Sequence, residues 1–109
     1  MIGVIRVANS RILIVDDEEL IRDLIKEYIS LENFVADEAV DGIQALQLFK
    51  QFNYDLIILD VMMPGMDGWS LCREIRKTSQ VPVIMLTARG EEYDKLLGFE
   101  LGVDDYMVK

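Results

Sequence analysis

The sequence has no histidine, one cysteine, and only 11 basic residues against 20 acidic ones. Without histidine it lacks the commonest zinc ligand and general base, and the single Cys72 excludes a disulfide within the chain. Cys72 is expected to be a small core residue, and a reducing cytoplasm fits this cysteine usage. No apolar run approaches the roughly 20 residues that span a membrane. A net charge of −9 argues against nucleic-acid binding by this segment, because affinity for phosphates comes from clustered lysine and arginine.

Apolar runs typical of strands alternate with stretches that have helical spacing. The strands are expected at residues 11–15, 34–39, 56–59, 81–86 and 105–108. The helices are expected from Leu20, between Asp41 and Phe52, after Asp67, which can cap its helix, and over 93–101. This alternation predicts one α/β domain of three layers, a doubly wound parallel sheet with helices on both faces. The wholly apolar strands should be central and the charged ones should be edges. Right-handed crossovers then give five strands in the order 2-1-3-4-5.

Polar side chains follow the ends of these strands. Asp16 and Asp17 follow the first strand, Asp60 the third, Thr87 the fourth and Lys109 the fifth. The carboxyl ends of parallel strands lie at one edge of the sheet, so these side chains should converge. Converging carboxylates repel unless a cation lies among them, and oxygen ligands without histidine or cysteine suit Mg²⁺. With a lysine and a hydroxyl beside it, Asp60 could act as the nucleophile of a phosphoryl transfer.

Two of these acids also have simpler explanations. Asp17 could be the N-cap of the first helix, with Glu18 and Glu19 favourable to the helix dipole. Asp60 precedes the turn-rich segment 63–68, which should leave it solvent-accessible at the mouth of a loop. Its carboxylate could instead only accept hydrogen bonds from loop amides. The residues alone leave these alternatives open.

Four motifs, spread over residues 12–109, carry a resemblance to a known family: VDDEE, LDVMMPGMDG, VIMLTA and GVDDYMVK. Together they resemble the receiver domain of a two-component response regulator, which has a flavodoxin-like fold. The resemblance implies that Asp60 accepts a phosphoryl group from a phosphohistidine on a sensor histidine kinase. It also implies a protein that phosphorylates and dephosphorylates itself and is not a turnover enzyme.

The resemblance assigns ligands to the metal. Asp17, Asp60 and the main-chain carbonyl of Met62 would bind Mg²⁺, and Asp16 would act through water. Met62 and Arg89, each two residues after a site residue, would also influence the lifetime of the phosphoryl group.

The resemblance assigns a switch as well. Thr87 and Lys109 would bind the phosphoryl group, and Tyr106 would be the aromatic rotamer switch. The segment GFELGVDDYMVK most resembles receivers fused to winged-helix DNA-binding domains. DNA contact would then belong to a domain outside this chain, and a homodimer is expected.

The sequence departs from the family at both ends. The family continues past its lysine into a proline, a loop and a fifth helix, whereas this sequence stops at Lys109. We therefore expect a leader of unknown role at 1–10 and a receiver domain at 11–109 without its fifth helix. Alternate residues of Leu56–Leu59 and Val83–Leu86 would then face water on the side of the first helix. An exposed apolar face would destabilise the chain and favour its burial by a partner chain, by a swapped element or by the apolar leader Met1–Ala8 folding over it.

Three other functions compete with that of a phosphoacceptor. A Mg²⁺-dependent hydrolase with an aspartyl nucleophile would need a second acid two residues after Asp60, where Met62 stands. A flavodoxin-like nucleotide-binding protein would need a glycine-rich loop after the first strand, where acids stand instead. A stand-alone receiver that acts by protein–protein interaction remains the alternative. The parent gene beyond Lys109 would discriminate it.

Overall fold

A computed structural model of the chain describes residues 10–30, 34–87 and 105–108. The described residues do not include the predicted helix at 93–101, Arg89, Lys109 or most of the expected leader. The side chains of 106–108 are not described either. The described elements, in chain order, are β1 (Arg11–Val15), α1 (Glu19–Ser30), β2 (Val35–Ala39), α2 (Gly42–Gln51), β3 (Leu56–Asp60), α3 (Gly68–Arg76), β4 (Val83–Thr87) and β5 (Asp105–Val108).

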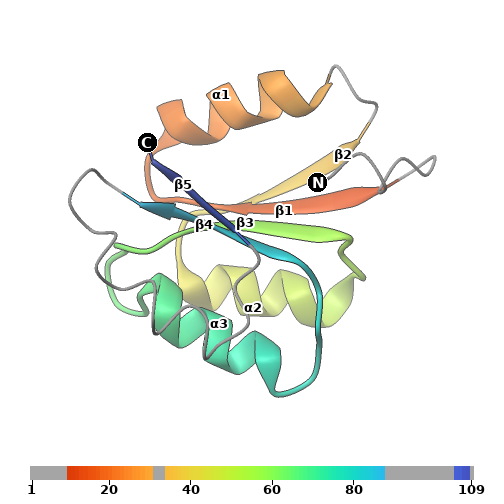
Figure 1. The fold of residues 1–109 in the computed structure, drawn as a ribbon, viewed down its shortest axis with the longest axis vertical. Helices are drawn as coiled ribbons and strands as arrows, with labels where there is room; N and C mark the ends of the chain where they lie inside the picture. The colour runs from red at the N-terminus through yellow and green to blue at the C-terminus, as the bar shows by residue number, and fades with distance from the viewer. Residues whose placement is uncertain (1–9, 31–33, 88–104, 109) are drawn as a thin grey trace.

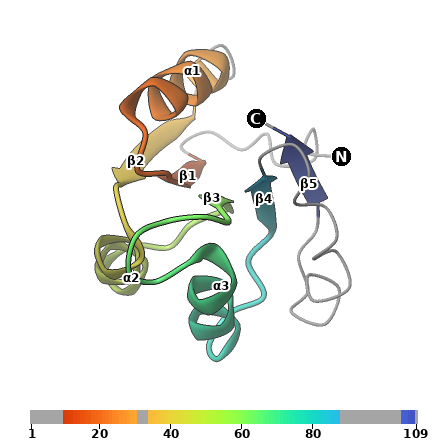
Figure 2. The same cartoon turned by 90° about the vertical axis from the view of Figure 1, so that its left-hand side faces the viewer.

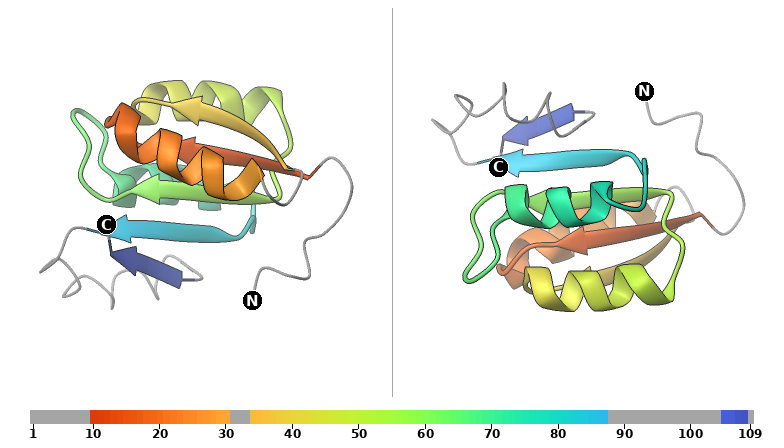
Figure 3. Two further views of the ribbon diagram at one scale, coloured as in Figure 1. Left: turned by 90° about the horizontal axis from the view of Figure 1, so that it is seen from above. Right: turned by 90° about the horizontal axis from the view of Figure 1, so that it is seen from below.

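The described elements form three layers. Helix α1 covers one face of the sheet, while α2 and α3 cover the other (Figures 1 and 2). All strand pairings are parallel, and the sheet has the order β2-β1-β3-β4-β5. The views from above and below show the strand arrows pointing the same way (Figure 3). The predicted doubly wound parallel sheet with helices on both faces is therefore confirmed.

The central strands are buried on both faces because they are wholly apolar. Every residue of β3 and β4 is buried, as are four of the five residues of β1. The alternating side chains divide into two clusters, one under α2 and α3 around Leu13, Ile57 and Met85, and one under α1 around Ile14 and Ile58. Strand β2 lies at the edge, and its charged residues Asp37 and Glu38 are only half-buried.

Helix α1 buries one of two apolar stripes. Ile21, Ile25 and Ile29 recur every four residues and pack against the cluster under α1. The second stripe, formed by Leu20, Leu24 and Tyr28, faces away from the core and is 69%, 54% and 79% exposed. The apolar residues that predicted the helix therefore do not all belong to its buried face.

Helices α2 and α3 are each capped by an aspartate. Asp41 accepts a hydrogen bond from the Gln44 amide, and Asp67 accepts one from the Ser70 amide, both at 2.8 Å. The predicted cap at Asp67 is thus confirmed, and Cys72 is fully buried as expected. Phe52, which was expected inside α2, is the C-cap residue after it and has an extended conformation. The Arg11 guanidinium lies over its ring, 3.8 Å from the ring centroid.

The prediction of an open apolar face beside α1 is wrong for the described strands. Leu56, Ile58, Ile84 and Leu86 are only 3–7% exposed. They belong to one cluster with residues of β1 and Ile29 of α1. The leader that was expected as one possible cover of this face lies outside the described residues. Among the described residues, no helix is long and apolar enough to cross a membrane.

Candidate functional site

The pairing register brings the carboxyl ends of three adjacent strands together. Val15 pairs with Leu59, and Asp60 pairs with Leu86. Asp16, Asp60 and Thr87 therefore stand at neighbouring strand ends on one edge of the sheet. The described residues include four buried polar or charged side chains, and three of them are these residues. Because burying polar groups costs free energy, their concentration at one edge marks a candidate site.

The turn after β1 gathers three carboxylates. Asp16 is fully buried, while Asp17 and Glu18 are exposed, and one carboxylate oxygen from each lies within 4.8 Å of the others. The Asp16 carboxylate also accepts a hydrogen bond from the Glu18 amide at 2.9 Å. Sequence reasoning assigned Glu18 only to the helix dipole and so missed its place in this group. The signal was its position beside two acids at the end of a strand.

Asp17 does not occupy the N-cap position. Helix α1 starts at Glu19, and the Arg22 amide donates to the carbonyl of Glu18 at 3.2 Å, so Glu18 is the residue directly before the helix. The N-cap explanation of Asp17 is therefore wrong. Its carboxylate is exposed beside the buried carboxylate of Asp16, which leaves it accessible to a ligand.

Asp60 is more deeply placed than the sequence suggested. Its side chain is 2% exposed, so the expectation of a solvent-accessible carboxylate is wrong. One carboxylate oxygen accepts a hydrogen bond from the Met62 amide at 3.3 Å, as the simpler explanation of this acid proposed. The strand end is fixed because the next amide, that of Val61, donates to the carbonyl of Leu86 on β4 at 3.0 Å. Hydrogen bonds to its side chain and from the next amide thus fix Asp60 at the carboxyl end of β3.

Gly68 allows α3 to begin directly against this strand end. Its amide donates to the carbonyl of Val61 at 2.8 Å. A Cβ atom at position 68 would lie 2.3 Å from the carbonyl oxygen of Asp60, which no side chain tolerates. Sequence reasoning treated Gly68 only as a turn residue. The signal that it packs closely was its place between a helix cap and a helix.

Thr87 ends β4 and is fully buried. Within the described part of the chain, its hydroxyl oxygen has no hydrogen-bond partner. Met62, whose carbonyl was a predicted ligand, has a 64% exposed side chain. Lys109 and the side chain of Tyr106 lie outside the described residues, so their predicted roles stay predictions.

Charged residues on α1 and β2 surround the turn after β1. The Arg22 guanidinium donates to the main-chain carbonyl of Asp16 at 2.8 Å and to Glu38 at 3.0 Å. Lys26 donates to Glu38 at 2.8 Å, and this hydrogen bond lowers the pKa of the Glu38 carboxyl below its usual value. Sequence reasoning did not identify Arg22, because its partner Glu38 is distant in sequence.

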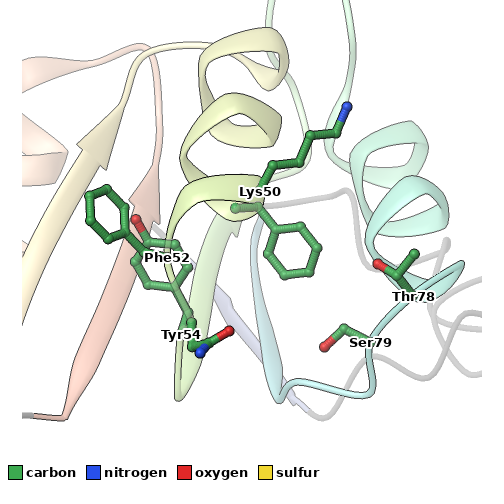
Figure 4. A pocket seen from close by; sticks show the side chains of 7 residues that line it. Lys50, Phe52, Tyr54, Thr78 and Ser79 are labelled. Carbon is green, nitrogen blue, oxygen red and sulfur yellow. The ribbon is translucent and has the colours of Figure 1, made fainter.

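A second feature lies at the opposite, amino-terminal edge of the sheet. A hollow of about 340 Å³ is lined by residues from the ends of α2 and α3 and from the segments that lead into β3 and β4 (Figure 4). Its labelled side chains are Lys50, Phe52, Tyr54, Thr78 and Ser79. None of the predicted site residues lines this hollow, so it is separate from the candidate site.

The candidate site offers only oxygen ligands from the described residues. Asp16, Asp17 and Glu18 supply carboxylates without histidine or cysteine, a set that fits Mg²⁺ better than softer metals. Because Asp60 is not part of this close group, its role as a metal ligand stays a prediction.

Sequence comparison places the chain among signalling proteins. Residues 12–109 match the family described as "Response regulator receiver domain". "Transcriptional regulatory protein ResD" of Bacillus subtilis is 52% identical over 101 residues, which cover 93% of this chain and 42% of ResD. "Transcriptional regulatory protein SrrA" of Staphylococcus aureus is 48% identical over the same shares of the two chains. The chain therefore spans about two-fifths of the length of these relatives.

Solved structures agree with the sequence match. Response regulator protein TrrA of Thermotoga maritima, solved in complex with Mg²⁺-BeF, superposes with a TM-score of 0.82 at 42% identity and covers 92% of this chain and 86% of its own. Chemotaxis protein CheY4 of Vibrio cholerae has a TM-score of 0.86 at 31% identity and covers 94% and 88%. With this sequence match and this flavodoxin-like fold, the chain belongs to the response regulator receiver domain family.

Proposed function

We propose that this chain is the phosphoacceptor domain of a two-component response regulator, and that Asp60 takes a phosphoryl group from a sensor histidine kinase. The observation that best supports this is the meeting of Asp16, Asp60 and Thr87, all buried, at three adjacent strand ends beside exposed acids. Membership of the receiver family implies an interaction with histidine kinases.

In the proposed reaction, a carboxylate oxygen of Asp60 attacks the phosphorus of a phosphohistidine. The new O–P bond forms as the N–P bond breaks, and the electron pair of that bond returns to the imidazole nitrogen. The Thr87 hydroxyl donates a hydrogen bond to a phosphoryl oxygen, and Lys109 neutralises its charge. Each domain takes one phosphoryl group and later loses it to water, so we propose a self-modifying receiver and not a turnover enzyme.

The carboxylates of the turn after β1 fit a divalent cation. We propose that Asp17, Asp60 and the Met62 carbonyl hold Mg²⁺ and that Asp16 acts through water, with Glu18 close enough to contribute. When bound, Mg²⁺ would offset the negative charge of the phosphoryl oxygens. The TrrA structure, described as a complex with Mg²⁺-BeF, supports this choice of metal.

The output of the domain is also part of the proposal. Relatives named transcriptional regulatory proteins are more than twice as long as this chain, which supports a DNA-binding function in another segment of the parent protein. The net charge of −9 agrees, because this domain would be repelled by DNA. Tyr106 would rotate on phosphorylation, and a homodimer and a cytoplasmic location complete the proposal.

A stand-alone receiver is the second candidate. The chain covers 88% of CheY4, a chemotaxis protein, so a protein of this size can be a nearly complete regulator in another organism. The parent gene decides between the two, because a gene that ends soon after this domain cannot encode a DNA-binding segment behind it.

Asp60→Asn tests the phosphoacceptor. The substitution keeps the size of the side chain and removes the nucleophile, so we expect a folded protein that gains no phosphoryl group from acetyl phosphate and Mg²⁺. Intact-mass spectrometry reads the result. Asp55→Asn is the matched control, because the exposed Asp55 lies just before the other end of the same strand and should leave phosphorylation unchanged. Phosphorylation of the Asp60→Asn protein at parental yield would exclude Asp60.

A further inference from the structure

The main chain of Asp16 is held on both sides. Its amide donates to the carbonyl of Ala39 on β2 at 3.1 Å, and its carbonyl accepts from the Arg22 guanidinium at 2.8 Å. That carbonyl belongs to the peptide between Asp16 and Asp17, which is planar. A fixed carbonyl therefore fixes the orientation of this peptide plane, and with it the position of the Asp17 main chain that carries the side chain.

Arg22 is itself held in place by its second hydrogen bond. Its Nε donates to Glu38 at 3.0 Å while Nη1 donates to Asp16, and the side chain is only 12% exposed. Glu38 is held in turn by Lys26 at 2.8 Å. A planar guanidinium can bind two acceptors in a fixed geometry, so the edge strand β2 determines where the turn after β1 lies.

From these contacts we infer that Arg22 is a positioning residue for the carboxylate group formed by Asp16, Asp17 and Glu18. The inference rests on the proposed function, because this group is the proposed Mg²⁺ site. Arg22 contacts a main-chain carbonyl and no carboxylate of the group in the described contacts, so it orders the turn without competing with the metal for a ligand.

A cation beside a metal site also has an opposing effect, since it repels Mg²⁺. Two features of the structure reduce this effect. The guanidinium is paired with the Glu38 carboxylate, which offsets its charge. Arg22 also contacts the main-chain carbonyl of Asp16, directly after β1, and not a carboxylate of the group. Ordering should therefore outweigh repulsion, and removal of Arg22 should weaken Mg²⁺ binding.

The experiment compares two variants that lose the same charge. Arg22→Gln removes the contact with Asp16, whereas Lys26→Gln removes a positive charge one helical turn away that also contacts Glu38 but does not reach the turn. Mg²⁺ affinity is measured by calorimetric titration, and circular dichroism checks that each variant is folded. We expect Arg22→Gln to weaken Mg²⁺ binding about tenfold, as for other partners behind a metal ligand. Lys26→Gln should weaken it much less, because the contact between Arg22 and Asp16 remains. Arg22→Lys keeps the positive charge but loses the planar guanidinium that can donate to two acceptors. This variant should also bind Mg²⁺ more weakly than the parent.

A second measurement does not depend on the metal. Hydrogen exchange without Mg²⁺ should be faster at the Glu18 amide in Arg22→Gln than in the parent and Lys26→Gln, because that amide donates to Asp16 within the same turn. Parental or tighter Mg²⁺ binding by Arg22→Gln, or equal weakening in both variants, would overturn the inference. If the parent itself binds no Mg²⁺, the proposed metal site fails, and exchange at Glu18 alone decides whether Arg22 positions the turn.

Discussion

At the scale of single residues, Gly68 shows how closely the site is packed. The start of α3 lies against the back of the strand end that carries Asp60, and only a residue without a Cβ atom fits there. Gly65, in the same loop, is glycine for a different reason. Its φ of 77° lies in the left-handed region, while no atom of the described residues lies within 4 Å of an added Cβ atom.

These two glycines give a matched pair of substitutions. Gly68→Ala must move either α3 or the Asp60 main chain, so we expect a loss of unfolding free energy of about 2–3 kcal/mol and slower phosphorylation of Asp60. Gly65→Ala should cost about 1 kcal/mol through backbone strain alone and leave phosphorylation intact. Urea denaturation and intact-mass spectrometry measure the two effects. Equal effects from both substitutions would mean that the close approach at Gly68 does not matter to the site.

At the scale of elements, a network around Asp37 connects the middle of β2 with the amino-terminal ends of β1 and β3. Asp37 on β2 accepts hydrogen bonds from the Arg11 side chain of β1 at 2.7 and 3.3 Å, and from the Tyr54 hydroxyl just before β3 at 2.7 Å. The hydrogen bond from Arg11 lowers the pKa of the Asp37 carboxyl below its ordinary 3.8, although burial opposes this change. Burial, and next the contact with Asp37, raises the pKa of the Tyr54 hydroxyl.

The lowered pKa of Asp37 predicts how stability depends on pH. A carboxyl with a lower pKa in the folded state stabilises the fold above its unfolded value of 3.8 and loses that contribution as pH falls through the folded pKa. We expect Asp37→Asn to lower the unfolding free energy by about 1 kcal/mol at neutral pH. The difference from the parent should shrink as the pH falls below 3.8.

Urea denaturation at several pH values measures this difference. Asp23→Asn is the control, because the Asp23 side chain is 54% exposed and, among the described residues, forms an ion pair only with Lys26, at 3.4 Å. A gap between the Asp37→Asn variant and the parent that stayed constant from neutral to acid pH would show that lost packing, and not the charge of Asp37, explains the change.

How much the sequence could predict also depends on the element. The parallel sheet and the cap at Asp67 were predictable because buried strands and helix starts follow local patterns. Helix α1 was only partly predictable, since its two apolar stripes have the same spacing, and tertiary packing alone selects the one containing Ile25. The role of Arg22 could not be predicted, because its pairing with Glu38 on β2 depends on how the chain folds. The depth of Asp60 could not be predicted either, because burial depends on residues distant in sequence.

At the scale of the whole molecule, negative charge dominates the electrostatics. The net charge is −9, and part of it is concentrated in the exposed acids beside the candidate site. Self-repulsion of this kind destabilises a compact state, and any added salt relieves it by screening. A stabilising effect of Mg²⁺ therefore has two possible causes, general screening and specific binding.

The two causes can be separated by thermal unfolding in Mg²⁺ and in KCl of equal ionic strength. Specific binding at about 100 times the Kd should add about 2.7 kcal/mol to the unfolding free energy, which for a domain of this size raises Tm by roughly 10 °C. Asp17→Asn should lose most of the rise that exceeds the KCl value, because it removes one proposed ligand. Glu19→Gln removes the same charge from an exposed neighbour outside the carboxylate group and should keep that rise. If Mg²⁺ and KCl raise the Tm of the parent equally, screening explains the effect and the acids after β1 are no metal site.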